Sequence, residues 1–262
     1  MSIDLEKSRS FIAEVELPPR PASGAVPQDA TTSAPVFETV KKQAAVVGSE
    51  VVSFMGGVDA ETRAALSNCA LLAQLAASKK VSDRKDIYAW YEAYFDVLKA
   101  LGWAVQDEGF ADFSETSDGF EVHEKIMEVA AVLLGPGSAA LAVIKTTLDA
   151  LKAMKSDNGW LTIFERETQH AEAARFQISL VEQNAGGDVM VSMLAFGIKA
   201  NKAVTQVLFF KIKKHKATLR HNSAKLSIDS ASLVDLAPDI REKVRAFQRG
   251  YVASLEIAAA PG

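Results

Sequence analysis

The sequence predicts an α+β protein, with an N-terminal layer of about five to six helices, a C-terminal antiparallel sheet of three to four strands and a final amphipathic helix. Two observations lead to this prediction. Apolar residues recur at three- and four-residue steps through most of 36–169, which is typical of helices. After residue 170 come runs rich in β-branched and aromatic residues, which favour strands. Helices followed by consecutive strands indicate α+β architecture.

The first 35 residues are predicted to form a flexible, proline-rich arm. Residues 18–35 hold five of the eight prolines of the chain among alanine, serine, threonine and glycine. Such a composition buries too little apolar surface to offset the entropy lost on ordering. The stretch before it, SFIAEVEL, has a strand-like pattern. The rest, 36–262, is predicted to be a single α+β domain, with a helical part at 36–169 and the sheet plus C-terminal helix at 170–258.

Three helices are predicted before residue 103. The first runs from residue 36 to the pair Gly56-Gly57, along apolar positions spaced three and four apart. The second begins at Asp59. The third spans 82–102, from a serine–aspartate start to a glycine beyond its last turn. Its aromatic residues at 88–95 point to several sides, so this helix is expected to pack between two layers, and a partner or ligand surface is the alternative.

The remainder of the helical part contains one irregular segment and three helices. Residues 103–121 alternate aromatic and acidic residues between turn signals, which indicates a short hairpin or an ordered loop. Two apolar helices are predicted at 122–134 and 138–154, hinged at Gly135-Pro136-Gly137. A short helix is predicted at 157–169.

The apolar helical hairpin 126–151 has an unusual charge pattern. Between Glu128 and Lys145 no charged residue occurs on any face. A packing helix with solvent on one side is expected to carry a polar stripe, so this pattern indicates either total burial or insertion into a membrane. The uncharged stretch is shorter than the roughly 20 residues of a spanning helix. No conventional transmembrane segment is therefore predicted.

The second half of the chain supplies the strands. RFQISLVEQ and DVMVSMLAFGIKA are joined by Asn184-Ala185-Gly186-Gly187 and are predicted to form an antiparallel hairpin. TQVLFFKIKKHKATL is a third predicted strand, and AKLSI is a fourth. After a predicted turn at 229–238, apolar residues from Ile240 to Leu255 recur with helical spacing, which gives the final amphipathic helix.

The N-terminus and the cysteine content bear on the cellular compartment. The first residues carry scattered charges and lack the apolar core of a secretory signal. The single cysteine, Cys69, excludes an intrachain disulfide framework and a cysteine-based zinc cluster. A cytoplasmic location is the default expectation, and export by a signal-independent route would leave no sequence signal.

Familiar catalytic motifs are missing or lack their structural context. GPGSAA at 135–140 fits the dinucleotide pattern G-x-G-x-x-A, but helices rather than parallel strands are predicted around it, so a hinge is the better interpretation. No two histidines have the i, i+4 spacing of a helical metal site, and neither a P-loop nor a G-x-S-x-G elbow occurs. We therefore expect no metal and no cofactor.

Cys69 has two interpretations. It lies within ALSNCALLAQLA, in line with leucines on one side of a predicted helix. A free cysteine among aliphatic residues is most often a small buried side chain with a raised pKa. The alternative is a site of lipid attachment or redox chemistry, which the absence of nearby cations disfavours.

The largest charge asymmetry of the chain lies at 199–225, which has no aspartate or glutamate although the net charge of the whole protein is −4. Lysines on an edge strand deter pairing between edges, which is one explanation. Neutralisation by the acidic segment 107–124 is a second, and an anionic partner is a third. The candidate anion-binding residues are Lys211, Lys213, Lys214, Lys216 and Arg220.

Three functional hypotheses follow from these patterns. The first is a non-enzymatic binding protein that turns a basic strand face toward an anionic membrane surface or an acidic protein. The alternative is a membrane-active bacterial toxin or virulence-type factor, which would act through the hairpin 126–151. The third is an enzyme with a site assembled from dispersed residues. Nucleic acid is an unlikely partner, because aromatic residues precede the basic cluster instead of interleaving with it.

Overall fold

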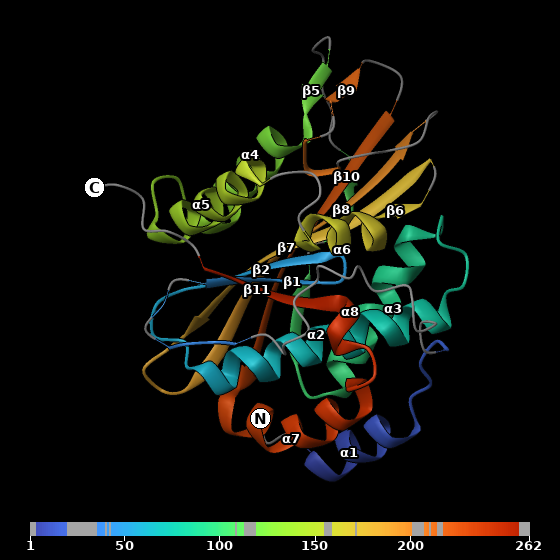
Figure 1. The fold of residues 1–262 in the computed structure, drawn as a ribbon, viewed down its shortest axis with the longest axis vertical. Helices are drawn as coiled ribbons and strands as arrows, with labels where there is room; N and C mark the ends of the chain where they lie inside the picture. Colours follow the sequence, from blue (N-terminus) through green and yellow to red (C-terminus); the bar gives the residue numbers. More distant parts are fainter. Residues whose placement is uncertain are drawn as a thin grey trace.

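The protein is built around a twisted β-sheet with helices on both faces (Figure 1). The structure is a computed structural model. It describes residues 4–19, 36–39, 41, 43–107, 109–112, 119–154, 159–170, 172–200, 207–209, 211–213 and 217–256.

The main sheet has the strand order β11-β1-β2-β7-β8-β10-β3, with β4 paired to β10 and β6 paired to β7. The pairing of β2 with β7 is parallel, and the other pairings are antiparallel. A separate two-stranded sheet joins β5 to β9. The strands are β1 (Gln43–Val47), β2 (Glu50–Phe54), β3 (Ala104–Asp107), β4 (Ala111–Asp112), β5 (Gly119–Glu121), β6 (Gln169–His170), β7 (Ala173–Gln183), β8 (Asp188–Ala200), β9 (Lys211–Lys213), β10 (Ala217–Asp229) and β11 (Val252–Glu256).

Each face of the sheet has its own hydrophobic core because successive side chains of a strand point to opposite faces. Along β7, Val181 belongs to one core and its neighbour Leu180 to the other. The first core contains α2 (Ala60–Lys80), α3 (Ile87–Ala100) and α7 (Ser230–Val244), and α1 (Leu5–Glu14) packs on α7. The second contains α4 (Val122–Leu134), α5 (Ala139–Ala153), α6 (Gly159–Thr168) and the short η1 (Val207–Phe209). A last short helix, α8 (Gln248–Tyr251), leads into β11.

Several predicted helices are confirmed with their caps. The Asp59 carboxylate accepts a hydrogen bond from the Thr62 amide at 2.7 Å, which fixes the start of α2. The hinge between α4 and α5 lies at 135–137, where Gly135 and Gly137 both have positive φ. The hairpin of β7 and β8 is also confirmed, with its turn at 184–187.

The first predicted helix is wrong, because residues 43–54 form the hairpin of β1 and β2. All ten strand residues are buried, so apolar residues occur on both faces of these strands. Such a run also contains apolar residues three and four positions apart, which is the spacing that predicted a helix. Gly48 makes the turn with φ of 53°, and a Cβ there would lie 2.4 Å from Gln74 Oε1. Only glycine fits this conformation and this approach without strain.

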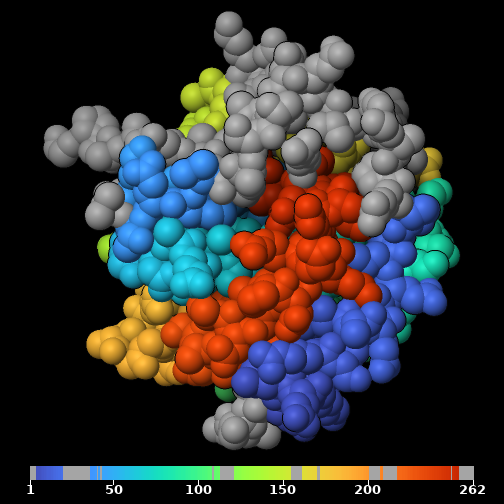
Figure 2. Space-filling model, turned by 60° about the horizontal axis from the view of Figure 1, so that its bottom comes forward, coloured from blue at the N-terminus to red at the C-terminus, as the bar shows by residue number. Residues whose placement is uncertain are grey.

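The predicted arm is helical over Leu5–Glu14, so neither a flexible arm nor a strand describes this segment. Ile12 is buried, and the Ser8 hydroxyl donates to the Ala100 carbonyl at 3.0 Å. Figure 2 shows α1, in blue, seated against the orange-red α7 on the molecular surface. Residues 20–35 lie outside the described residues. The division into an arm and a single domain stays a prediction.

The C-terminal part also differs from its prediction. Residues 217–229 form one long strand, β10, where the sequence predicted parts of two strands. The predicted turn at 229–238 is the beginning of α7, because the Asp229 carboxylate caps it at Ser232. Helix α8 ends at Tyr251, and the residues after it form β11, which pairs with β1. The sheet is therefore larger than the three to four strands predicted.

Candidate functional site

The hairpin of α4 and α5 is the candidate site that the structure sets apart. Glu121 and Glu124 form a capping box that starts α4, and the Ser138 hydroxyl accepts from the Leu141 amide at 3.1 Å to start α5. The two helices pack against each other and cover one face of the sheet (Figure 1). Their buried apolar residues are Val122, Ile126, Val129, Ala130, Ile144, Leu148 and Leu151.

Charge is confined to the base of this hairpin. Lys125 pairs with Glu128 at 2.8 Å near the start of α4, and the next charged residue is Lys145 in α5. A hydroxyl pair also holds the hairpin to the sheet, since Ser53 of β2 donates to Thr147 of α5 at 2.9 Å. The base is therefore polar and anchored, whereas the end that carries the hinge has no charge.

The uncharged end of the hairpin is not fully buried. Val132 is 85% exposed, and Pro136 and Gly137 in the hinge are exposed too. Total burial, one of the two explanations for the missing charges, therefore does not apply to this end.

Within the described residues, no helix combines the length and apolar character needed to cross a bilayer. We call residues 131–143 the hairpin tip. Its partly buried apolar members are Leu133, Leu134, Ala140, Leu141 and Val143.

The described part of the basic cluster pairs with the acidic segment of the chain. In the β5–β9 pair, Lys211 is opposite Glu121 and Lys213 is opposite Gly119. The Arg220 guanidinium pairs with the Asp112 carboxylate at 2.8 Å and lies over the ring of Tyr88. The pair of Arg220 with Asp112 supports neutralisation by 107–124 as the reason for the positive charge at this end of the cluster. Two of its members, Lys214 and Lys216, lie outside the described residues.

Cys69 is buried, as the sequence predicted. It is 1% exposed in α2, and its Sγ accepts a hydrogen bond from Trp103 Nε1 at 3.2 Å. Burial raises the pKa of the Cys69 thiol to about 12, so the thiolate is scarce at neutral pH. The position favours packing over lipid attachment or redox chemistry.

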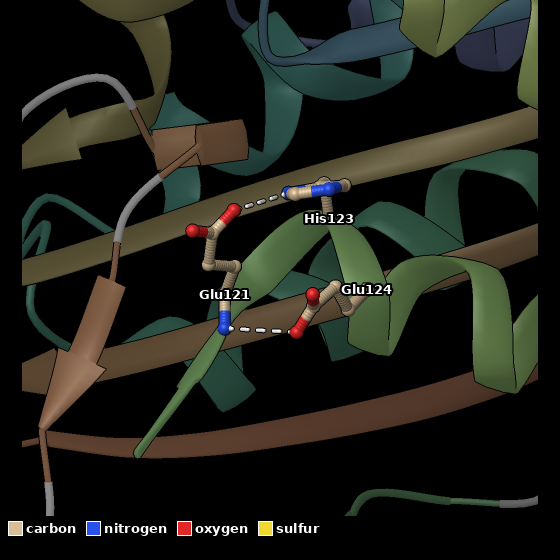
Figure 3. Close-up of side chains that lie close together, drawn as sticks. All are labelled: Glu121, His123 and Glu124. Atoms are coloured by element: carbon tan, nitrogen blue, oxygen red, sulfur yellow. Dashed lines mark hydrogen bonds and ion pairs between the residues drawn. The ribbon is translucent and has the colours of Figure 1, made fainter.

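Three potential metal ligands meet at the start of α4 (Figure 3). The ligand atoms of Glu121, His123 and Glu124 lie within 4.8 Å of one another. The His123 Nδ1 is 3.3 Å from Glu121 Oε2, and the Glu124 carboxylate accepts from the Glu121 amide. Both carboxylates already serve the capping box, so helix capping accounts for the cluster without an ion.

A polar group that the sequence analysis missed lies in the first core. Glu50 is 1% exposed, and its carboxyl accepts hydrogen bonds from Ser179 Oγ, Tyr94 OH and Gln74 Nε2 at 2.5, 3.2 and 3.4 Å. Burial raises the pKa of Glu50. The adjoining cavity of about 20 Å³ is far smaller than the roughly 300–1,000 Å³ of a ligand pocket. The group is therefore internal and gives no support to an enzyme.

A larger hollow of about 610 Å³ lies between α1 and the ends of β8 and β10. Two of its carboxylates are helix caps, because Asp4 accepts from the Lys7 amide and Asp229 from the Ser232 amide. A third, Asp188, accepts from the side-chain amide of Asn184. These acids have structural roles, and the hollow does not identify a reaction.

The comparisons with known proteins give distant similarities only. No protein-family model and no curated protein matches the chain. Among solved structures, it is similar to a delta-endotoxin, with 16% identity and a TM-score of 0.41 over 70% of this chain and 84% of that one. It is similar to the Evf virulence factor, with 9% identity and a TM-score of 0.34 over 95% and 90% of the two chains.

A third similar structure is the activated Cyt2Ba monomer from Bacillus thuringiensis subsp. israelensis. The identity is 16% and the TM-score 0.25, over 50% of this chain and 76% of that one. At these TM-scores the similarities carry no argument about function. The function has to be argued from the residues of this chain.

Proposed function

We propose that the protein is membrane-active, in the manner of a toxin or virulence-type factor, and that it binds lipid bilayers through the hairpin tip. One observation carries the proposal: Val132 is 85% exposed within a stretch that has no charge from residue 129 to residue 144. Exposed, uncharged apolar surface of this kind is a feature of protein-binding and membrane-binding sites. The polar, anchored base of the hairpin leaves the tip as the part that would enter lipid.

The dimensions favour shallow insertion of the tip. Helix α4 has 13 residues and is therefore about 20 Å long, whereas the hydrocarbon core of a bilayer is about 30 Å thick. Burying a valine or leucine side chain in an apolar medium contributes roughly 1.5–3 kcal/mol. Val132 and the partly buried leucines beside it would supply this contribution without the cost of moving a charge into lipid.

The attraction would not depend on anionic lipid, which separates this proposal from the first sequence hypothesis. A basic strand face would bind anionic vesicles and release them in salt, at about 1 kcal/mol per lysine. That hypothesis has less support because Arg220 is paired with Asp112. It stays as the second candidate, through Lys211, Lys213, Lys214 and Lys216.

The two candidates are separated by flotation with neutral phosphatidylcholine vesicles and with anionic vesicles. We compare the wild type with Val132→Glu, which places a charge on an exposed side chain of the tip. The matched control is Val36→Glu, at a valine that is 64% exposed and outside the hairpin. We expect Val132→Glu to lower binding to both vesicles at least tenfold, and Val36→Glu to leave it unchanged.

Equal binding by the two variants would refute the role of the tip. If Lys213→Glu/Lys214→Glu/Lys216→Glu instead abolished binding, and only to anionic vesicles in low salt, the basic-face hypothesis would replace it. Release of a trapped dye measures in the same samples whether the bound protein also permeabilises the bilayer.

A further inference from the structure

The hairpin of α4 and α5 becomes less buried toward its hinge, and it does so at the same level on both helices. The buried apolar residues of each helix recur at steps of three and four and are at most 6% exposed. These series are Val122, Ile126 and Val129 in α4, and Leu151, Leu148 and Ile144 in α5. The next members toward the hinge, Leu133 and Leu141, are only partly buried. The contacts that hold the hairpin on the protein are therefore weaker at the tip than at the base.

The charge of the exposed surface changes at this level too. On the exposed side of α4, Glu128 is followed at the next four-residue step by Val132. On the exposed side of α5, read away from the hinge, Ala139 and Ala142 are followed three residues later by Lys145. The boundary between apolar and charged surface thus lies at Glu128 on one helix and at Lys145 on the other.

These two charged residues are equally far from the hinge. Glu128 precedes Gly135 by seven residues, and Lys145 follows Ser138 by seven. At a rise of 1.5 Å per residue, each lies about 10 Å along its helix from the hinge. The hydrocarbon core of a bilayer is about 30 Å thick, so the part of the hairpin beyond this level is shorter than one leaflet.

Lys145 is the residue at this level whose charge can reach a partner outside the protein. Glu128 already has a partner, since Lys125 donates to its carboxylate at 2.8 Å. Lys145 is exposed, and its ammonium has no ion-pair partner among the described residues. A lysine at a boundary between water and lipid can lay its hydrocarbon stem along apolar surface and keep its charged end in the polar region.

We infer, on the basis of the membrane binding proposed above, that Lys145 binds the phosphate group of a membrane phospholipid and limits the depth to which the tip enters. The phosphate of phosphatidylcholine carries a negative charge although the headgroup is neutral overall, so an ammonium can pair with it in a neutral bilayer. With Glu128 and Lys145 held among the headgroups, the tip enters at most about 10 Å, because moving either charge into hydrocarbon is costly.

Flotation with two neutral bilayers tests whether Lys145 recognises phosphate. Phosphatidylcholine carries a phosphate, whereas digalactosyldiacylglycerol has a sugar headgroup without one. We expect the wild type to bind phosphatidylcholine about two- to fivefold more tightly, the range for an exposed ion pair, and Lys145→Ala to bind both lipids equally. Lys145→Arg keeps the charge and should keep the preference. The control is Lys152→Ala, at an exposed lysine of the same helix about 10 Å farther from the hinge, which should bind like the wild type.

Moving the lysine along α5 tests whether it limits the depth. In Ala142→Lys/Lys145→Ala the charge lies three residues closer to the hinge, on the same exposed side of the helix. This variant should retain the preference for phosphatidylcholine but enter less deeply, by up to about 4–5 Å. Depth is measured with an environment-sensitive dye on Val132→Cys and with phosphatidylcholines that carry a quencher near the headgroup or near the end of the acyl chain. Quenching should shift toward the shallow position in the variant.

The results separate a failure of this role of Lys145 from a failure of the membrane proposal. A preference for phosphatidylcholine that Lys145→Ala removes, together with a shallower dye when the lysine is moved, supports the assignment. Wild-type binding that is equal for the two lipids, or a dye depth that does not respond to the moved lysine, contradicts it and leaves membrane binding by the tip in place. Absence of wild-type binding to either lipid contradicts both proposals.

Discussion

The two helical layers of the protein bury their residues to different extents. In α2, 15 of 21 residues are buried, and these include polar ones such as Arg63 and Gln74. In α4 only five of 13 residues are buried, although the end of this helix has no charge. Burial explains the composition of the first layer. It does not explain the second, where Val132 is exposed and other apolar residues of the tip are only partly buried. A partner surface would cover this apolar area.

Truncation of one leucine in each layer tests this difference with the largest effect. Leu72→Ala in α2, at a residue that is 0% exposed, should lower the free energy of unfolding by about 2–5 kcal/mol through a cavity. Leu133→Ala in the hairpin tip should cost less than about 1 kcal/mol, because Leu133 is only partly buried. Denaturant unfolding of both variants measures the two values. Equal losses would show that the tip is part of the core.

Removal of residues 1–19 tests whether the first layer needs α1 as its cover. The arm predicted from the sequence would be dispensable, but Ile12 is buried and Lys243 Nζ donates to the Ala13 carbonyl at 2.7 Å. Loss of the buried isoleucine alone should cost about 1.5–3 kcal/mol. We therefore expect a lower thermal midpoint. An unchanged midpoint would restore the prediction of a dispensable arm.

A pH titration of stability tests the polar group inside the first layer. The raised pKa of Glu50 means that the folded state binds its proton more tightly than the unfolded state does. Its contribution is therefore fully present below 4.5, the ordinary pKa of a glutamate side chain, and is lost as pH rises through the raised pKa. The nearby titratable groups Cys69, Tyr91 and Tyr94 have pKa values raised by burial and remain neutral there.

Glu50→Gln keeps the shape of the side chain and has no proton to lose. We expect the free energy of unfolding of this variant to decline less with rising pH than that of the wild type, and to exceed it at neutral pH. Urea unfolding over a pH series measures both curves. Parallel curves would show that the carboxyl of Glu50 does not titrate within the folded range.

The parts of the fold that could be predicted from the sequence are those with local signals. The helix caps Asp59 and Ser138 each accept a hydrogen bond from an amide three residues further along the chain. The turn at 184–187 joins two strands that pair with each other. The strand β1 could not be recognised, because a fully buried apolar run has no period of two. Its pairing with β11 joins residues about 200 positions apart and leaves no local pattern.

The sites show the same limit. The uncharged stretch after Glu128 was visible in the sequence, but the exposure of Val132 was not, because it depends on which face of α4 packs against the sheet. The basic cluster seemed unpaired because its acidic partner precedes it by about 100 residues; Asp112 reaches Arg220 only through the pairing of β4 with β10.

The most direct test of the central claim is a fluorophore placed on the hairpin tip. Val132→Cys and Val36→Cys are labelled in the folded state with an environment-sensitive dye, since buried Cys69 should react slowly. On addition of phosphatidylcholine vesicles, the dye at residue 132 should brighten and shift to the blue, as it does in an apolar medium, whereas the dye at residue 36 should not change. Vesicle-bound protein whose dye at residue 132 still reports water would contradict insertion of the tip.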